Sequence, residues 1–148
     1  MRRTTGSLVI AIILSALACL TACNPQEKIL SGTDQAAVLA FSEAATDNLF
    51  AGMTANDYAS FSRDFDADMQ AALPASHFET FKQDLDSKIG NYLSRTVDQV
   101  IQSGEFYVVI YQTKFELEEP VIVRVVFRVA EPHSISGLWF DSKKLRQK

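Results

Sequence analysis

The feature that most constrains the fold is a change in the spacing of apolar residues at Gly90. Before Gly90, apolar side chains recur every three to four residues, which is the period of a helix with one buried face. After it, apolar and polar residues alternate, as in a strand with one buried face. Helices grouped before strands predict an α+β fold, with N-terminal helices packed on one face of an antiparallel sheet.

Two long helices are expected before Gly90, with short helical turns between them. Thr33 or Asp34 can cap the first long helix, and Gly52 is expected to end it. Pro74 fits the first turn of the second long helix, which Gly90 ends. The expected buried stripes are Val38, Phe41, Ala45 and Leu49 in the first helix, and Phe78, Phe81, Leu85 and Ile89 in the second.

Four strands are expected after Gly90, and short turns containing Gly or Pro join them into an antiparallel meander. The third strand places Arg124 and Arg128 on the face opposite its apolar row. The expected strands are 96–102, 106–117, 121–129 and 135–141. One face of the second strand is expected to hold Tyr107, Val109, Tyr111, Thr113, Phe115 and Leu117.

The N-terminal segment has the pattern of a bacterial export signal. Arg2 and Arg3 precede an apolar run at residues 8–20, which is shorter than the roughly 20 residues that a membrane-spanning helix needs. The run ends in Leu20-Thr21-Ala22-Cys23, which resembles the lipobox of bacterial lipoproteins. In a lipobox the cysteine is lipidated and becomes the first residue after cleavage. We therefore expect a signal peptide at residues 1–22 and a lipid on Cys23.

Two other interpretations of this segment stay open: a cleaved signal that releases a free product, and an uncleaved anchor. Residues 23–33, with Pro25 and Gly32, are expected to form the lipidated cysteine and a flexible tether. The domain then spans residues 34–142, and 143–148 form a basic tail. The expected location is the cell envelope, with a membrane bound through the lipid. Asn24 after Cys23 fits the periplasmic side of the outer membrane in a Gram-negative organism. In a Gram-positive one, the lipid would hold the chain on the outer face of the cell membrane.

Several core and turn residues carry a resemblance to a known family. They are Tyr58-Ala59-Ser60-Phe61-Ser62-Arg63-Asp64-Phe65-Asp66, Met69, Ala72-Leu73-Pro74, Phe78, Gly90 and Ile135-Ser136-Gly137-Leu138-Trp139-Phe140. From about Ala36 to Phe140 the chain resembles the family called domain of unknown function 3887. Its order of elements resembles the nuclear transport factor 2-like superfamily. That resemblance implies a cone, in which helices close a curved four-stranded meander sheet. Because the matching positions are core and turn positions, they imply a fold more than an activity.

The composition excludes several kinds of chemistry. The only cysteines are Cys19 and Cys23, so the expected domain has no thiol nucleophile and no cysteine zinc site. With 14 Lys and Arg against 18 Asp and Glu, the chain lacks the basic excess that nucleic-acid binding favours. His77 and His133 lack the spacing of metal ligands. The acidic run at 64–68 lacks the Gly and Glu that a calcium loop needs. We expect no metal, no cofactor and no catalytic residue.

Six residues are candidates for lining a pocket, although the aromatic ones also fit a core and the arginine also fits a solvated strand face. They are Tyr58, Phe61, Tyr107, Tyr111, Arg124 and Trp139. We expect a non-catalytic domain that binds a small ligand or an envelope protein. One alternative, implied by other cone folds, is an isomerase or dehydratase with Asp57 or Asp66 beside a tyrosine hydroxyl. Another is a structural module that forms a homodimer through the open face of its sheet.

Overall fold

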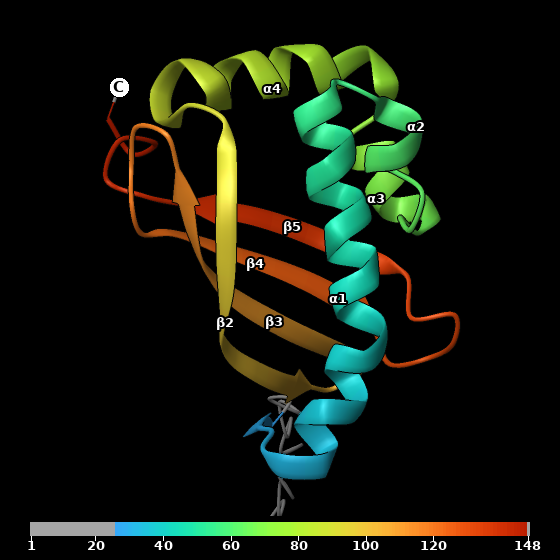
Figure 1. The fold of residues 1–148 in the computed structure, drawn as a ribbon. Coiled ribbons are helices and arrows are strands. Elements are labelled where there is room, and N and C mark those ends of the chain that lie inside the picture. The colour runs from blue at the N-terminus through green and yellow to red at the C-terminus, as the bar shows by residue number, and fades with distance from the viewer. Residues whose placement is uncertain (1–25, 148) are drawn as a thin grey trace, which may run out of the picture.

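The computed structural model describes residues 26–147, which form helices packed against one antiparallel sheet (Figure 1). The expected signal peptide and Cys23 lie outside the described residues. Within that described part, no helix is long and apolar enough to cross a membrane. The elements in chain order are β1 (Glu27–Ile29), α1 (Gly32–Ala55), α2 (Tyr58–Phe61), α3 (Ala67–Ala72), α4 (Ala75–Ile89), β2 (Tyr92–Ser103), β3 (Phe106–Phe115), β4 (Val121–Arg128) and β5 (Ile135–Asp141).

The sheet is a meander in the order β1-β2-β3-β4-β5, and every neighbouring pair is antiparallel. The predicted α+β class is therefore confirmed, but the sheet has five strands where four were expected. The additional strand, β1, lies in the stretch expected to be a flexible tether. Ile29 pairs with Ile101, and the Leu30 N–H donates to the Val100 carbonyl at 2.8 Å. Three residues are too few to show the alternation by which a strand is recognised.

Helix α1 differs from its prediction at both ends. Ser31 is its N-cap, without a side-chain hydrogen bond, and Asn56 ends it in the left-handed region at φ 55°. Gly52 was expected to end this helix and instead lies inside it. A Cβ at position 52 would lie 2.2 Å from the Phe61 backbone nitrogen. Gly52 therefore does not end the helix. Its lack of a side chain allows the backbones of α1 and α2 to approach closely.

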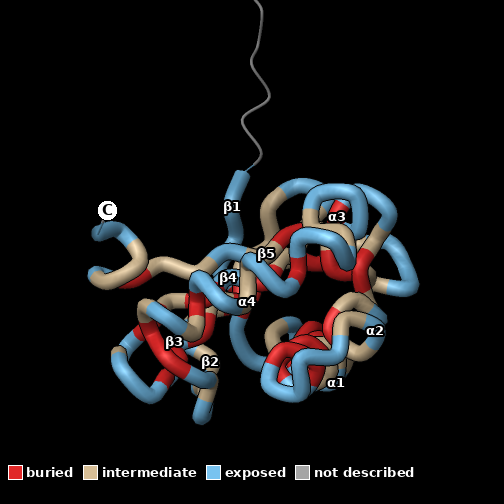
Figure 2. Tube along the Cα trace, turned by 90° about the horizontal axis from the view of Figure 1, so that it is seen from above, coloured by how far each residue is buried: buried red, intermediate tan, exposed pale blue. Residues whose placement is uncertain are grey.

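The sheet has two faces, and the helices cover only one of them. Helix α1 runs across this inner face, and α4 lies across one end of the sheet (Figure 1). Figure 2 shows buried residues gathered where the helices meet the sheet. The expected buried face of β3 is confirmed from Val109 to Phe115, but Leu117 lies beyond the strand and is 53% exposed. The fully buried aromatic and aliphatic side chains of the inner face are Val100, Val109, Tyr111, Val121, Val123, Val125, Phe127 and Ile135.

The helical stripe is confirmed for most of α4 and is shifted for α1. In α4, Phe78, Leu85 and Ile89 are buried, whereas the expected Phe81 is only partly buried. Gly90 ends the helix at φ 79°. In α1, two polar residues, Ser42 and Thr46, are buried in place of the expected Phe41 and Ala45. The stripe is therefore turned so that polar side chains face the sheet, which leads to the polar cluster described below.

Candidate functional site

The outer face of the sheet exposes an apolar surface that no described helix covers (Figure 1). Cross-strand pairing aligns Val108 with Val126, and Ile110 with Arg124. Trp139 pairs with Arg124 and is 56% exposed. These side chains line a shallow cleft of about 500 Å³. We call this surface the outer patch, and its lining residues are Glu27, Ile101, Val108, Ile110, Arg124, Val126 and Trp139.

Two charged residues of the outer patch have no ion-pair partner within residues 26–147: Arg124 near its centre and Glu27 on β1. Both residues are exposed. The Trp139 ring lies over Gly137, where a Cβ would be 2.3 Å from the indole carbons. The absence of a side chain at Gly137 therefore leaves room for the edge of the indole, and the exposed Trp139 ring lies in the patch with an arginine that has no ion-pair partner among the described residues.

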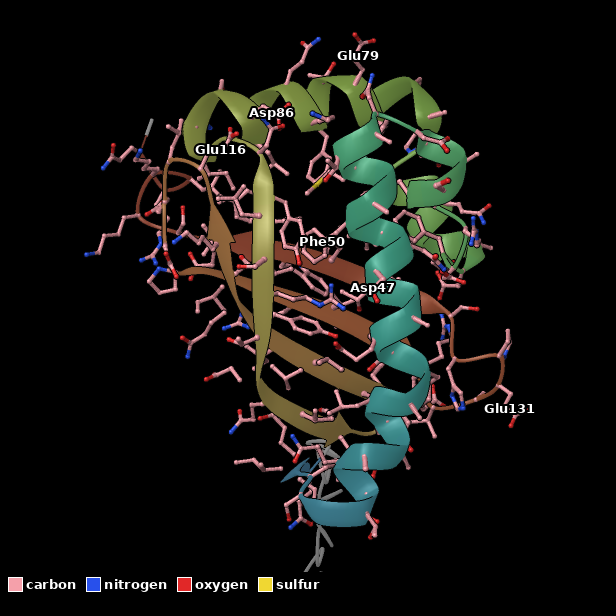
Figure 3. The ribbon with its side chains drawn as sticks, in the orientation of Figure 1. Asp47, Phe50, Glu79, Asp86, Glu116 and Glu131 are labelled. Carbon is pink, nitrogen blue, oxygen red and sulfur yellow. The ribbon has the colours of Figure 1, made fainter. Side chains whose placement is uncertain are left out.

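A polar cluster joins α1 to the inner face of the sheet. The Tyr111 hydroxyl donates to Glu43 Oε1 at 2.7 Å, and Thr46 Oγ1 lies 3.1 Å from the same hydroxyl. Arg95 Nη2 lies 2.7 Å from Asp47 Oδ1 and 3.2 Å from Glu43 Oε2. Figure 3 shows Asp47 and Phe50 on the side of α1 beside β2. The cluster therefore connects one helix with two strands through hydrogen bonds and charge.

Burial and charge set the protonation states in this cluster. Burial raises the pKa of Tyr111 above its ordinary range, so the hydroxyl stays protonated. Burial alone would lower the pKa of Arg95, but hydrogen bonds to Tyr92 and Asp47 and the charge of Glu43 raise it. The Arg95 guanidinium also lies 5.2 Å from the centroid of the Tyr111 ring. Because the Tyr111 hydroxyl already donates to a carboxylate, it has no second proton to offer a ligand.

A second cleft lies between the N-terminal half of α1 and the sheet. It has a volume of about 350 Å³. Phe41 stacks on His133 with ring centroids 4.1 Å apart, and Tyr107 lies 6.1 Å from Phe41. We call it the α1 cleft, and its lining residues are Leu30, Asp34, Ala37, Val38, Phe41, Gln102, Tyr107 and His133.

The two acids considered for catalysis cap helices. Asp57 accepts from the Ala59 N–H and the Ser60 hydroxyl, and its pKa is lowered, chiefly by the Ser60 side chain. Asp66 accepts from the Met69 N–H at 2.8 Å and from Arg128 Nε at 2.7 Å.

Burial would raise the pKa of Asp66, but these two donors lower it below its ordinary value. No tyrosine hydroxyl hydrogen-bonds either acid among the described side chains. The acid–tyrosine pair expected for the enzyme alternative is therefore not formed by Asp57 or Asp66.

The six candidate pocket residues do not share one pocket. The Tyr58 hydroxyl donates to the Leu73 carbonyl at 3.0 Å, and Phe61 is a core residue that is 1% exposed. Tyr107 lines the α1 cleft, and Tyr111 belongs to the polar cluster. The remaining two, Arg124 and Trp139, lie together on the outer patch. The sequence could not show that these residues lie in different places. The alternation along a strand predicts which face a side chain is on, but not what covers that face.

Comparison with known protein families matches residues 46–138 to a family described as protein of unknown function (DUF3887). The chain belongs to this family. The resemblance to DUF3887 expected from the sequence is confirmed. No curated protein and no solved structure matched the chain. The matched stretch of the DUF3887 domain includes Arg95, Tyr111 and Arg124, whereas Asp34 and Phe41 of the α1 cleft lie before it.

Several residues of the polar cluster escaped the sequence analysis. Glu43 and Asp47 are one helical turn apart and both contact Arg95, which lies 52 positions from Glu43 along the chain. One signal was visible: Ser42 and Thr46 interrupt the apolar stripe at four-residue spacing. Buried polar residues of a helix usually need partners. Thr46 finds one on the sheet, the Tyr111 hydroxyl, whereas the Ser42 hydroxyl has none among the described residues.

Proposed function

We propose that this chain is an exported lipoprotein of the cell envelope, anchored through Cys23, and that its DUF3887 domain binds a protein partner without catalysis. The lipobox pattern at 20–23 supports the anchor. Helices closing one face of a meander sheet support a nuclear transport factor 2-like fold. The engagement of Asp57 and Asp66 as helix caps supports a role other than acid–base catalysis.

The outer patch is the observation that carries the proposed binding function. Apolar side chains on both faces of β3 and β4 exceed what folding requires, because only the inner face is covered by helices. Contiguous exposed apolar surface on a soluble domain commonly marks a site of protein association. An aromatic side chain beside an arginine is also typical of interface hot spots, and Trp139 and Arg124 form such a pair.

The occupant that we propose is a second copy of this chain. In a two-fold interface the same patch faces itself, so each charge must meet its opposite across the axis. The outer patch holds one unpaired base, Arg124, and one unpaired acid, Glu27. Two copies face to face can therefore pair Arg124 of each with Glu27 of the other. Lipid anchors would confine both copies to one membrane and raise their effective concentration.

The test measures the mass of the full-length protein in detergent by light scattering, with the detergent contribution subtracted. We expect a dimer at micromolar concentration and a monomer for Arg124→Glu, which places like charges opposite each other. The double variant Glu27→Arg with Arg124→Glu should restore the dimer. Arg63→Glu is the matched control, because Arg63 is an exposed arginine next to α2, outside the outer patch, and has no ion-pair partner among the described residues. A monomeric wild-type protein, or a dimer unaffected by Arg124→Glu, would contradict the proposed partner.

The anchor has a separate test. Cells expressing the wild-type chain or Cys23→Ser are grown with radiolabelled palmitate, and the chain is then isolated. We expect label on the wild-type chain alone. Label that persists on Cys23→Ser would refute the assignment of the lipidation site.

A further inference from the structure

The α1 cleft contains polar side chains that have no protein partner. Gln102 on β2 and Tyr107 on β3 are directly opposite each other in the strand register. Both line the cleft. Among residues 26–147, neither the Tyr107 hydroxyl nor the Gln102 amide forms a side-chain hydrogen bond with protein. Two adjacent polar groups without protein partners at the wall of a cleft are available to a ligand.

Aromatic rings form another wall of this cleft. Phe41 stacks on His133, and the Tyr107 ring centroid lies 6.1 Å from that of Phe41 and 6.4 Å from that of His133. His133 Nδ1 lies 3.1 Å from the Arg128 carbonyl oxygen. A carbonyl oxygen can only accept a hydrogen bond, so Nδ1 carries a proton and the ring is held in place by this contact. The wall therefore presents π faces from three rings whose positions are fixed by one another and by this hydrogen bond.

Asp34 adds a carboxylate in the first turn of α1. Its Oδ2 accepts from Lys28 Nζ at 3.2 Å, and the two side chains are 62% and 64% exposed. Ion pairs this exposed contribute little to stability, so a ligand can displace the lysine at small cost. Asp34 Oδ1 has no partner among the described side chains. Hydrogen-bond acceptors therefore predominate in a cleft that also has aromatic faces.

We propose that the α1 cleft binds a small organic cation, with its ammonium group between the Asp34 carboxylate and the Tyr107 ring. A carboxylate supplies charge-assisted hydrogen bonds, and the negative face of an aromatic ring attracts a cation. The volume of about 350 Å³ fits a ligand with one ring or a short chain. This site lies on the inner side of the sheet and does not depend on the proposed dimer.

Full-length ¹⁵N-labelled protein in detergent is titrated with benzylammonium chloride and followed by amide NMR. We expect saturable shifts at Phe41, Gln102, Tyr107 and His133. Sodium benzoate has the same ring with the opposite charge, so it should shift these signals at least tenfold less at equal concentration. Absence of saturation by benzylammonium, or equal binding of benzoate, would overturn the proposal.

Variants separate charge from shape in the same titration. Asp34→Asn should weaken benzylammonium binding about tenfold, because it removes the charge and keeps the size. Tyr107→Phe keeps the ring and should bind within about threefold of wild type, whereas Tyr107→Ala should lose about tenfold. Glu131→Gln, an exposed acid outside the cleft lining, is the control for general charge and should not change binding.

Asp34 is exposed in the first turn of α1, so its variant should keep the fold. Unchanged dispersion of the core amide signals would verify this. If Asp34→Asn binds benzylammonium as the wild type does, the cation site is refuted.

Discussion

The two faces of the same sheet differ in how their apolar residues are used. Along β4, Val123 and Val125 face the helices and are fully buried, whereas Arg124 and Val126 face away from them. Folding explains the inner residues, because their burial stabilises the domain. It does not explain why the outer face is also apolar around Trp139. The comparison shows that one face is used for stability, and it supports the proposal that the other face is used for association.

The largest expected effect tests the inner face. Phe127→Ala should lower the free energy of unfolding by about 3–5 kcal/mol, because Phe127 is fully buried and packs against Phe41. Trp139→Ala on the outer face removes a larger ring and should cost less than about 1 kcal/mol. Denaturant unfolding of both variants in the monomeric Arg124→Glu background measures the difference without a contribution from the proposed dimer. If the tryptophan variant is the less stable one, the assignment of the two faces is wrong.

A smaller effect concerns the polar group on the inner face. Tyr111→Phe should cost about 1 kcal/mol at pH 7, because Glu43 and Thr46 each lose a hydrogen-bond partner. In the unfolded chain a tyrosine ionises near pH 10, whereas burial raises the pKa of Tyr111 in the fold. Above about pH 10 the unfolded state therefore holds fewer protons than the folded state, so the free energy of unfolding falls as the pH rises further.

This alkaline loss of stability can be assigned to one residue. Tyr111→Phe should therefore remove part of the loss. Chemical denaturation of the wild-type protein and Tyr111→Phe between pH 8 and about pH 11 provides the measurement. The same alkaline slope in wild type and Tyr111→Phe would show that Tyr111 titrates as an exposed tyrosine does.

The smallest expected effect is that of Val126→Ala, which is compared with its buried neighbour Val125 on the same strand. Val125→Ala shortens a buried side chain by two carbon atoms and should lower the free energy of unfolding by about 1.5 kcal/mol or more. Val126→Ala should change the stability of the monomer by no more than about 0.5 kcal/mol. It should instead weaken the proposed dimer, because Val126 lines the outer patch. Unfolding in the monomeric Arg124→Glu background separates the loss of monomer stability from the loss of dimerisation. Equal losses of stability for Val125→Ala and Val126→Ala in that background would contradict the difference between the two faces.

Much of the fold could be predicted from local patterns. The last strand was expected at 135–141 and is found at Ile135–Asp141. The α4 stripe and the Gly90 stop were also correct. These features depend on residues close together in the chain, where the period of side chains decides the structure.

The features that were missed depend on distant contacts. Gly52 resembles a helix stop until the backbone of α2 is placed beside it. Arg95 reaches Glu43 and Asp47 only after β2 lies along α1. The outer patch had a local signal that went unused. Val108, Val109 and Ile110 are consecutive apolar residues, which indicates a strand with apolar side chains on both faces.

Strand β1 bears on how far the domain can move. With the lipid proposed for Cys23, only Asn24, Pro25 and Gln26 separate the anchor from the paired strand. A fully extended chain gains at most about 3.6 Å per residue, so the four steps from Cys23 to Glu27 span roughly 14 Å at most. The domain would then be held with the β1 end toward the bilayer, while α4 lies at the opposite end of the sheet (Figure 1). If the three residues of β1 separated from the sheet, the distance between the lipid anchor and the domain could roughly double. Release of β1 from the sheet would therefore lengthen the tether.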